Sequence, residues 1–178
     1  MKAAACLLAA LLSSTAGAAG AVGEGDVISA EMAVTIVDPE GREYSLEAAL
    51  FPGGTPAPVT LLVFWASWCQ PCISEVPVLN ELHRYYGKRG LRIVGLGVTN
   101  GGDTLGKMLE AASKHAVVYP VFFDSEGAAE KAFGLSGIPT SALIDSRKTV
   151  RWIGPNLPRD INKRIEQAME GLTPGGSE

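Results

Sequence analysis

Two cysteines separated by two residues constrain this chain more than any other feature. They end the segment 64–72, which reads Phe-Trp-Ala-Ser-Trp-Cys-Gln-Pro-Cys, and stand where an apolar run gives way to a helical pattern. A strand that delivers Cys69 to a helix N-terminus places its thiol beside unpaired backbone N–H groups and the positive end of the helix dipole. Both stabilise a thiolate. Cys72 follows one helical turn later and can close a disulfide with Cys69, so the motif predicts a dithiol/disulfide switch. We expect Cys69 to be the exposed thiol of lower pKa and Cys72 the buried one.

Two other interpretations of this cysteine pair are less favoured. Half of a structural zinc site is one, but such a site needs four ligands. The chain offers only Cys6 as a further cysteine, and its two histidines, His83 and His115, lack the spacing of a ligand pair. A purely structural disulfide is the other. It would close a very short loop, where the entropic gain is smallest.

Length and composition indicate a globular domain. The chain has 178 residues, enough for one domain with a sizeable core. Its hydrophobic fraction of 47% and charged fraction of 19% exclude a disordered chain. The net charge is −4 and no basic cluster occurs, which argues against nucleic acid as a partner.

Residues 1–21 have the pattern of a signal peptide. A basic residue, Lys2, precedes an apolar run over 3–12, and small residues with two Ala-x-Ala choices follow over 13–21. We expect export to the periplasm or another extracytoplasmic compartment. An uncleaved membrane anchor stays open, because residues 3–22 have spanning length. Lipidation of Cys6 is disfavoured, because the apolar core follows this cysteine instead of preceding it. The cleaved chain would keep only Cys69 and Cys72 as thiols.

Hydrophobic patterning predicts alternating strands and helices. Strands are expected at 34–37, 42–45, 60–66, 91–98, 119–123, 141–144 and 150–153, and helices at 45–50, 70–86, 104–115, 126–133 and 158–169. A βα alternation that ends in a hairpin and a helix indicates one α/β domain with a mixed sheet. We assign this domain to residues 26–171 and a flexible tail to residues 172–178.

The chain resembles the exported TlpA/ResA-like thiol–disulfide oxidoreductases, a group with the thioredoxin fold that includes reductases of cytochrome c maturation. Four features between residues 34 and 169 carry the resemblance. They are the segment 64–72, Pro77 within the helix after the cysteines, the stretch Gly137-Ile138-Pro139-Thr140, and an insertion between the strands 91–98 and 119–123. The resemblance implies a central mixed sheet flanked by helices, with an N-terminal hairpin and an insertion after the second core strand.

The resemblance also assigns residues to the site. Thioredoxin has a buried Asp where this chain has Val63, whereas the TlpA/ResA-like proteins place a Glu three residues after the second Cys, here Glu75. The resemblance implies that Glu75 accepts the proton that Cys72 must lose; a solvated first-turn Glu is the alternative. It further implies a cis peptide before Pro139. The residues implied for contact with substrate are Trp68, Gln70, Pro71, Ile138 and Pro139.

The function that the resemblance implies is reduction of disulfides in exported proteins, such as apocytochrome c or metal-site assembly proteins. Neither a metal nor an organic cofactor is implied. The expected partners are a disulfide-containing protein and a membrane dithiol that supplies electrons, and the chain is expected to be a monomer. A disulfide-forming oxidant of the same fold is the alternative. A copper-binding assembly chaperone is a third interpretation, although it favours a wider Cys spacing and a His near Pro139.

Overall fold

Within residues 21–54 and 57–170, the part of the chain that the computed structural model describes, a seven-stranded mixed sheet organises the fold. The strand order is β2-β1-β5-β4-β3-β6-β7. Strands β3, β4 and β5 are parallel, and β1, β2, β6 and β7 pair antiparallel with their neighbours. The strands are β1 (Thr35–Val37), β2 (Glu43–Ser45), β3 (Val59–Trp65), β4 (Leu91–Val98), β5 (Val121–Asp124), β6 (Thr140–Asp145) and β7 (Val150–Pro155).

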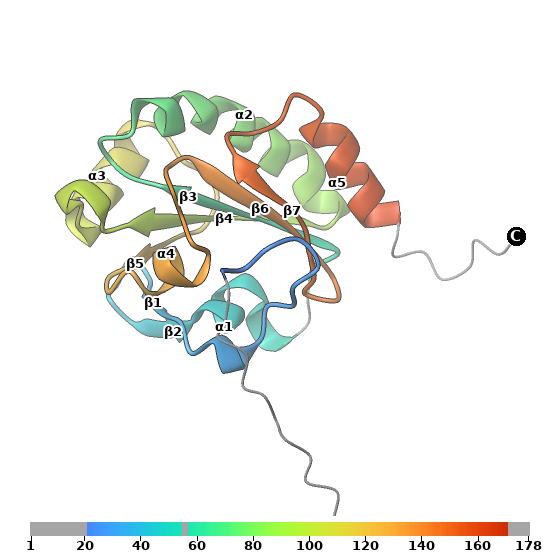
Figure 1. Ribbon diagram of the computed structural model, residues 1–178. Coiled ribbons are helices and arrows are strands. Elements are labelled where there is room, and N and C mark those ends of the chain that lie inside the picture. The colour runs from blue at the N-terminus through green and yellow to red at the C-terminus, as the bar shows by residue number, and fades with distance from the viewer. Residues whose placement is uncertain (1–20, 55–56, 171–178) are drawn as a thin grey trace, which may run out of the picture.

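Helices cover both faces of this sheet, as Figure 1 shows. The helices are α1 (Leu46–Leu50), α2 (Gln70–Tyr86), α3 (Leu105–Lys114), α4 (Ala128–Ala132) and α5 (Ile161–Glu170). Helices α2 and α5 pack on one face over a core that includes Leu79, Leu82 and Ile165. Helices α1 and α4 pack on the other face, where the core includes Leu50 and Ala129. The expected α/β architecture with an N-terminal hairpin, β1–β2, is confirmed.

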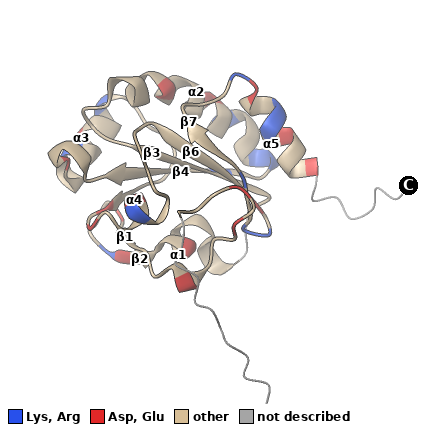
Figure 2. Ribbon diagram, viewed as in Figure 1, with Lys and Arg blue, Asp and Glu red and all other residues tan. Residues whose placement is uncertain are grey.

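Strand β3 lies at the centre because its sequence is apolar on both faces. All seven of its residues are buried, which is typical of a central strand covered on both sides. Figure 2 shows charged residues of both signs on the helices and turns around it. The described residues include no helix that is long and apolar enough to cross a membrane.

Helix α2 begins and ends where the sequence predicts. Cys69 caps its N-terminus, and Pro71 stands in the first turn, where a missing N–H costs no hydrogen bond. Its residues Val76, Leu79 and Leu82 are buried at helical spacing. Pro77 lies inside the helix, as expected from its position.

Most element boundaries agree with the sequence prediction to within one residue. The larger differences are that α5 starts at Ile161 and not at residue 158, and that β5 starts at Val121 and not at residue 119. Helix α4 also starts at Ala128 and not at residue 126, and β7 extends to Pro155 and not only to residue 153. Pro120 lies directly before β5 and has no backbone N–H to donate to a neighbouring strand, whereas α5 is preceded by a turn over residues 159–160. The expected signal peptide lies outside the described residues except for Ala21, and the tail at 172–178 lies wholly outside them.

Candidate active site

A disulfide joins Cys69 and Cys72 at the N-terminus of α2, with Cα atoms 5.3 Å apart. The sulfur of Cys69 accepts a hydrogen bond from the backbone N–H of Cys72 at 3.2 Å. Cys69 therefore occupies the capping position that the sequence predicts for it. Such a position favours negative charge on the sulfur once the disulfide is reduced.

Both cysteines are buried in this disulfide-bonded state. Cys69 and Cys72 are each 3% exposed. The expectation that Cys69 is exposed is therefore wrong for the oxidised form. The physical reason is that both residues belong to the core cluster on the α1 and α4 side, together with Phe64 and Ala66.

The segment just before Cys69 is held by the connection that follows β4. Asp103 accepts hydrogen bonds from the N–H and the hydroxyl of Ser67, at 2.6 Å and 2.7 Å. The indole N–H of Trp68 donates to the carbonyl oxygen of Asn100 at 2.9 Å, and Trp68 is 48% exposed. A Cβ at Gly101 would lie 2.8 Å from the Trp68 ring, so the backbone approaches the indole closely there. The insertion thus positions the residues that lead into the cysteine pair.

Glu75 lies one turn after Cys72 and is partly buried against the end of β7. Its Oε1 accepts a hydrogen bond from the backbone N–H of Leu157 at 2.7 Å. Its Oε2 is buried and has no hydrogen-bond partner among the described residues. Burial raises the pKa of Glu75, and the Leu157 hydrogen bond opposes part of that rise. Buried Tyr119 is close enough that the charge of Glu75 adds to the burial effect in raising the tyrosine pKa.

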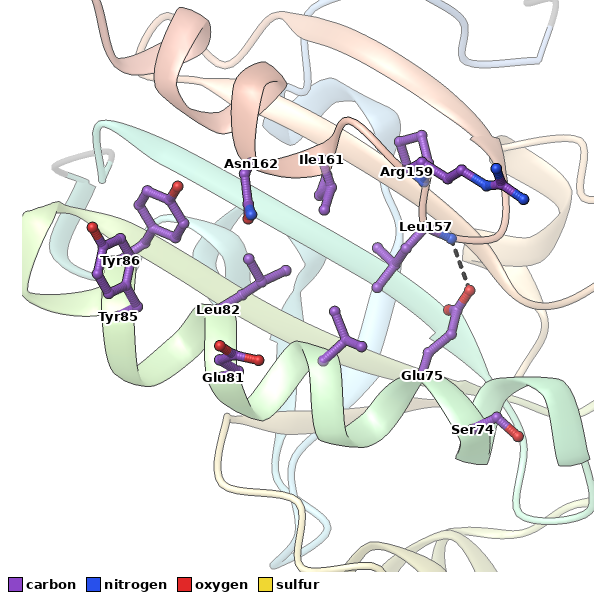
Figure 3. A pocket seen from close by; sticks show the side chains of 12 residues that line it. Ser74, Glu75, Glu81, Leu82, Tyr85, Tyr86, Leu157, Arg159, Ile161 and Asn162 are labelled. Carbon is purple, nitrogen blue, oxygen red and sulfur yellow. Dashed lines mark hydrogen bonds between the residues drawn. The ribbon is translucent and has the colours of Figure 1, made fainter.

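A groove of about 580 Å³ runs from Glu75 along α2 (Figure 3). Helix α2 forms one wall, and the start of α5 with the residues before it forms the other. Glu75 and Leu157 stand at one end, while Tyr85 and Tyr86 stand at the other. This opening gives solvent a route to the neighbourhood of the carboxyl group.

The loop over residues 137–140 approaches the cysteines from β6. The peptide bond between Ile138 and Pro139 is cis, as expected. Thr140 pairs with Phe64 of β3 on one side and with Pro155 of β7 on the other. Ile138 is partly buried against the core cluster that contains both cysteines. This loop therefore lies at the same end of the sheet as the disulfide.

The structure brings most of the predicted site residues together. Gln70 and Pro71 are exposed on the first turn of α2, and Trp68 lies just before it. Sequence reasoning missed Asp103 and the Leu157 amide. Asp103 follows an Asn-Gly-Gly turn, which is a loop signal, but no local pattern indicates its contact with Ser67. No sequence pattern predicts the contact of Leu157 with Glu75, because it is made by the backbone N–H and not by the side chain.

Comparison with known proteins identifies the family. The model of the family described as Redoxin matches residues 28–164. The chain belongs to this family. It is 31% identical over 131 residues to the thiol-disulfide oxidoreductase ResA of Geobacillus thermodenitrificans, covering 72% of this chain and 70% of that one. It is 24% identical over 110 residues to sporulation thiol-disulfide oxidoreductase A of Bacillus subtilis, covering 61% and 67%. This redoxin is a thiol–disulfide oxidoreductase of the ResA type.

Solved structures show the same fold. A thiol:disulfide interchange protein of the thioredoxin family from Chlorobium tepidum matches with a TM-score of 0.61 and 25% identity, over 85% of this redoxin and 99% of that chain. The thioredoxin domain of a thiol-disulfide oxidoreductase from Bacteroides vulgatus matches with a TM-score of 0.66 and 17% identity, over 83% and 98%. The expected thioredoxin fold is confirmed.

Proposed function

We propose that this redoxin is an exported reductase of protein disulfides. The observation that carries the proposal is the Cys69–Cys72 disulfide at the capped N-terminus of α2. In the reduced enzyme, the Cys69 thiolate attacks one sulfur of a substrate disulfide, and the other substrate sulfur leaves as a thiolate. Cys72 then loses its proton and attacks the Cys69 sulfur of the mixed disulfide. The substrate leaves as a dithiol and the enzyme as the disulfide.

Glu75 is the acceptor that we assign to the proton of Cys72. Its position one turn further along α2 supports this role, as does a buried Oε2 without a described partner. A carboxyl whose pKa is raised by burial is also closer to working pH, where general base help is most effective. The groove beside Glu75 then offers solvent as the destination of that proton.

Substrate contact belongs, in this proposal, to the rim around the disulfide. Trp68, Gln70 and Pro71 supply one side, and Ile138 and Pro139 supply the other. Cys69 and Cys72 are each 3% exposed in the disulfide form, and this burial favours a substrate whose cysteine lies in an extended, accessible segment.

The compartment and partners follow from the expected signal and the family. Residues 1–21 would direct export to the periplasm or anchor the domain at the membrane. Candidate substrates are apocytochrome c and metal-site assembly proteins, and a membrane protein with its own dithiol would return two electrons to the oxidised enzyme.

The equilibrium redox potential of the Cys69–Cys72 pair tests the direction of electron flow. We expect a value near that of thioredoxin, about −270 mV, measured against glutathione or dithiothreitol. A value more positive than about −180 mV would favour the disulfide-forming oxidant instead. Copper titration of the reduced protein tests the chaperone alternative, which requires tight stoichiometric binding.

A further inference from the structure

The four residues 155–158 make two contacts with different parts of the site through successive backbone amides. The N–H of Asn156 donates to the carbonyl oxygen of Pro139 at 3.0 Å. The N–H of the next residue, Leu157, donates to Oε1 of Glu75 at 2.7 Å. One short segment is thus bonded to the loop 137–140 on one side and to the carboxylate in α2 on the other.

The sequence of this segment, Pro-Asn-Leu-Pro, restricts its backbone at every position. Pro155 has a fixed φ, and Pro158 keeps Leu157 out of the helical region. Asn156 has φ 56°, in the left-handed region that Asn tolerates better than most residues. Its side chain is exposed, and no hydrogen bond from that side chain is seen among the described residues, so its structural contribution lies in the backbone turn.

We propose that residues 155–158 are a positioning element of the site, in which the left-handed turn at Asn156 aims two amides so that Glu75 and the loop 137–140 are held in one fixed relation. The assignment of Glu75 as proton acceptor is the part that rests on the proposed function. The consequence is reciprocal coupling: a change in the charge of Glu75 alters the Leu157 hydrogen bond, and the altered segment transmits that change to Pro139.

The other groups around Glu75 leave the Leu157 amide as its main polar partner. Cys72 and Glu81 lie on the same helix, and Tyr119 is buried in the core cluster under α2. Arg159 stands on the opposite wall of the groove. Figure 3 shows the Arg159 side chain directed away from Glu75, while the Leu157 N–H faces the carboxylate.

A pair of substitutions at Asn156 tests the backbone turn without touching Glu75. Asn156→Gly keeps access to positive φ, whereas Asn156→Val does not, and both remove the amide side chain. The readout is the titration midpoint of the Glu75 carboxyl carbon in the oxidised protein, measured by ¹³C NMR and assigned by its loss in Glu75→Gln. We expect Asn156→Val to raise the midpoint by about one pH unit, a tenfold change in protonation ratio, because the stabilising N–H is lost. Asn156→Gly should match the wild type.

The amide resonance of Thr140 reports the second contact. In the wild type and in Asn156→Gly, the chemical shift of this amide should change with pH at the same midpoint as the Glu75 carboxyl group. In Asn156→Val it should not respond to the titration of Glu75. Equal midpoints in all three proteins, or a Thr140 amide that ignores Glu75 in the wild type, would overturn the proposal. If Asn156→Val does not fold, Asn156→Ala gives the same comparison with a milder backbone penalty. Failure of the proposed function would be seen elsewhere, as wild-type disulfide reduction by Glu75→Gln.

Discussion

Asp103 accepts two hydrogen bonds from Ser67, one from the backbone N–H and one from the hydroxyl, although 36 residues separate them. Asp103 is 5% exposed and also accepts from the N–H of Thr104. The start of the cysteine motif is therefore fastened to the connection after β4 by one buried carboxylate.

Replacing this carboxylate should loosen the motif. Asp103→Ala leaves the Ser67 N–H and hydroxyl, which are partly buried, and the Thr104 N–H without their acceptor, so we expect a loss of about 2 kcal/mol in the free energy of unfolding. Asp103→Asn retains one acceptor oxygen and should lose about half as much. Urea unfolding of the oxidised protein measures both. Lys107→Ala is the control, since Lys107 donates from the exposed side to the carbonyl of Gly102; a loss as large as that of Asp103→Ala would contradict the prediction.

Substitutions at two neighbouring glycines distinguish the effect of the Trp68 contact on stability from the effect of backbone strain. Gly101 and Gly102 have φ of 69° and 74°, but only at Gly101 would a Cβ meet the indole, at 2.8 Å. Gly102→Ala should cost about 1 kcal/mol for the left-handed backbone alone. Gly101→Ala should cost roughly 1–2 kcal/mol more and alter Trp68 fluorescence, because the ring must move. Equal unfolding midpoints and spectra for the two variants would show that the indole contact is unimportant.

In the reduced protein, Cys69 should react first with iodoacetamide. Although both cysteines are equally buried in the disulfide, only the Cys69 sulfur caps the helix and accepts the N–H of Cys72. That hydrogen bond and the helix dipole lower a thiol pKa. Mass spectrometry of the singly alkylated protein identifies the residue modified. Preferential labelling of Cys72 would reverse the assigned roles.

Glu75→Gln should slow disulfide reduction at neutral pH by about 10²-fold, because Gln cannot accept a proton. In the wild type the rate should fall as pH drops through the raised pKa of Glu75, since only the ionised carboxylate accepts. The variant should lack this fall. Initial rates with a disulfide peptide across pH 5 to 9 measure both effects (about two units either side of neutrality). Glu81→Gln, on the same groove wall, is the control and should keep the wild-type profile.

The same raised pKa has a consequence for stability. A carboxyl that binds its proton more tightly when folded contributes stability below its unfolded pKa, and this contribution is lost as pH rises through the folded pKa. Glu75→Gln should therefore raise the Tm of the oxidised protein at pH 7 relative to the wild type, with little difference at low pH. A lower Tm at neutral pH would mean that the Leu157 contact outweighs burial of the charge.

The sequence predicts those structural features that depend on residues close together along the chain. Helix α2 is predicted over its full length because a capping Cys69, an early Pro71 and apolar residues at helical spacing all agree. The late start of α5 is missed because the pattern after Pro158 already looks helical, although the helix begins only at Ile161.

Contacts between distant segments could not be predicted in the same way. Asp103 contacts Ser67, and Leu157 contacts Glu75, only after the strands of the sheet have paired. The sequence around Asp103 or Leu157 contains no pattern that predicts which residue each one contacts. The position of Cys69 before the helix predicts an exposed side chain, whereas the packing of the whole core cluster buries it in the disulfide form.

The distance along the chain between the parts of the site sets the order in which they can form. Cys69 and Cys72 are 3 positions apart, so an oxidant can join them in a chain that has not yet folded. Glu75 receives the N–H of Leu157 from 82 residues further on, after β7 has docked against β6. The disulfide can thus form as soon as both thiols have been synthesised, whereas the environment of the carboxyl group is completed by the segment after the last strand. A chain trapped before that step would carry the correct disulfide and still lack the finished site.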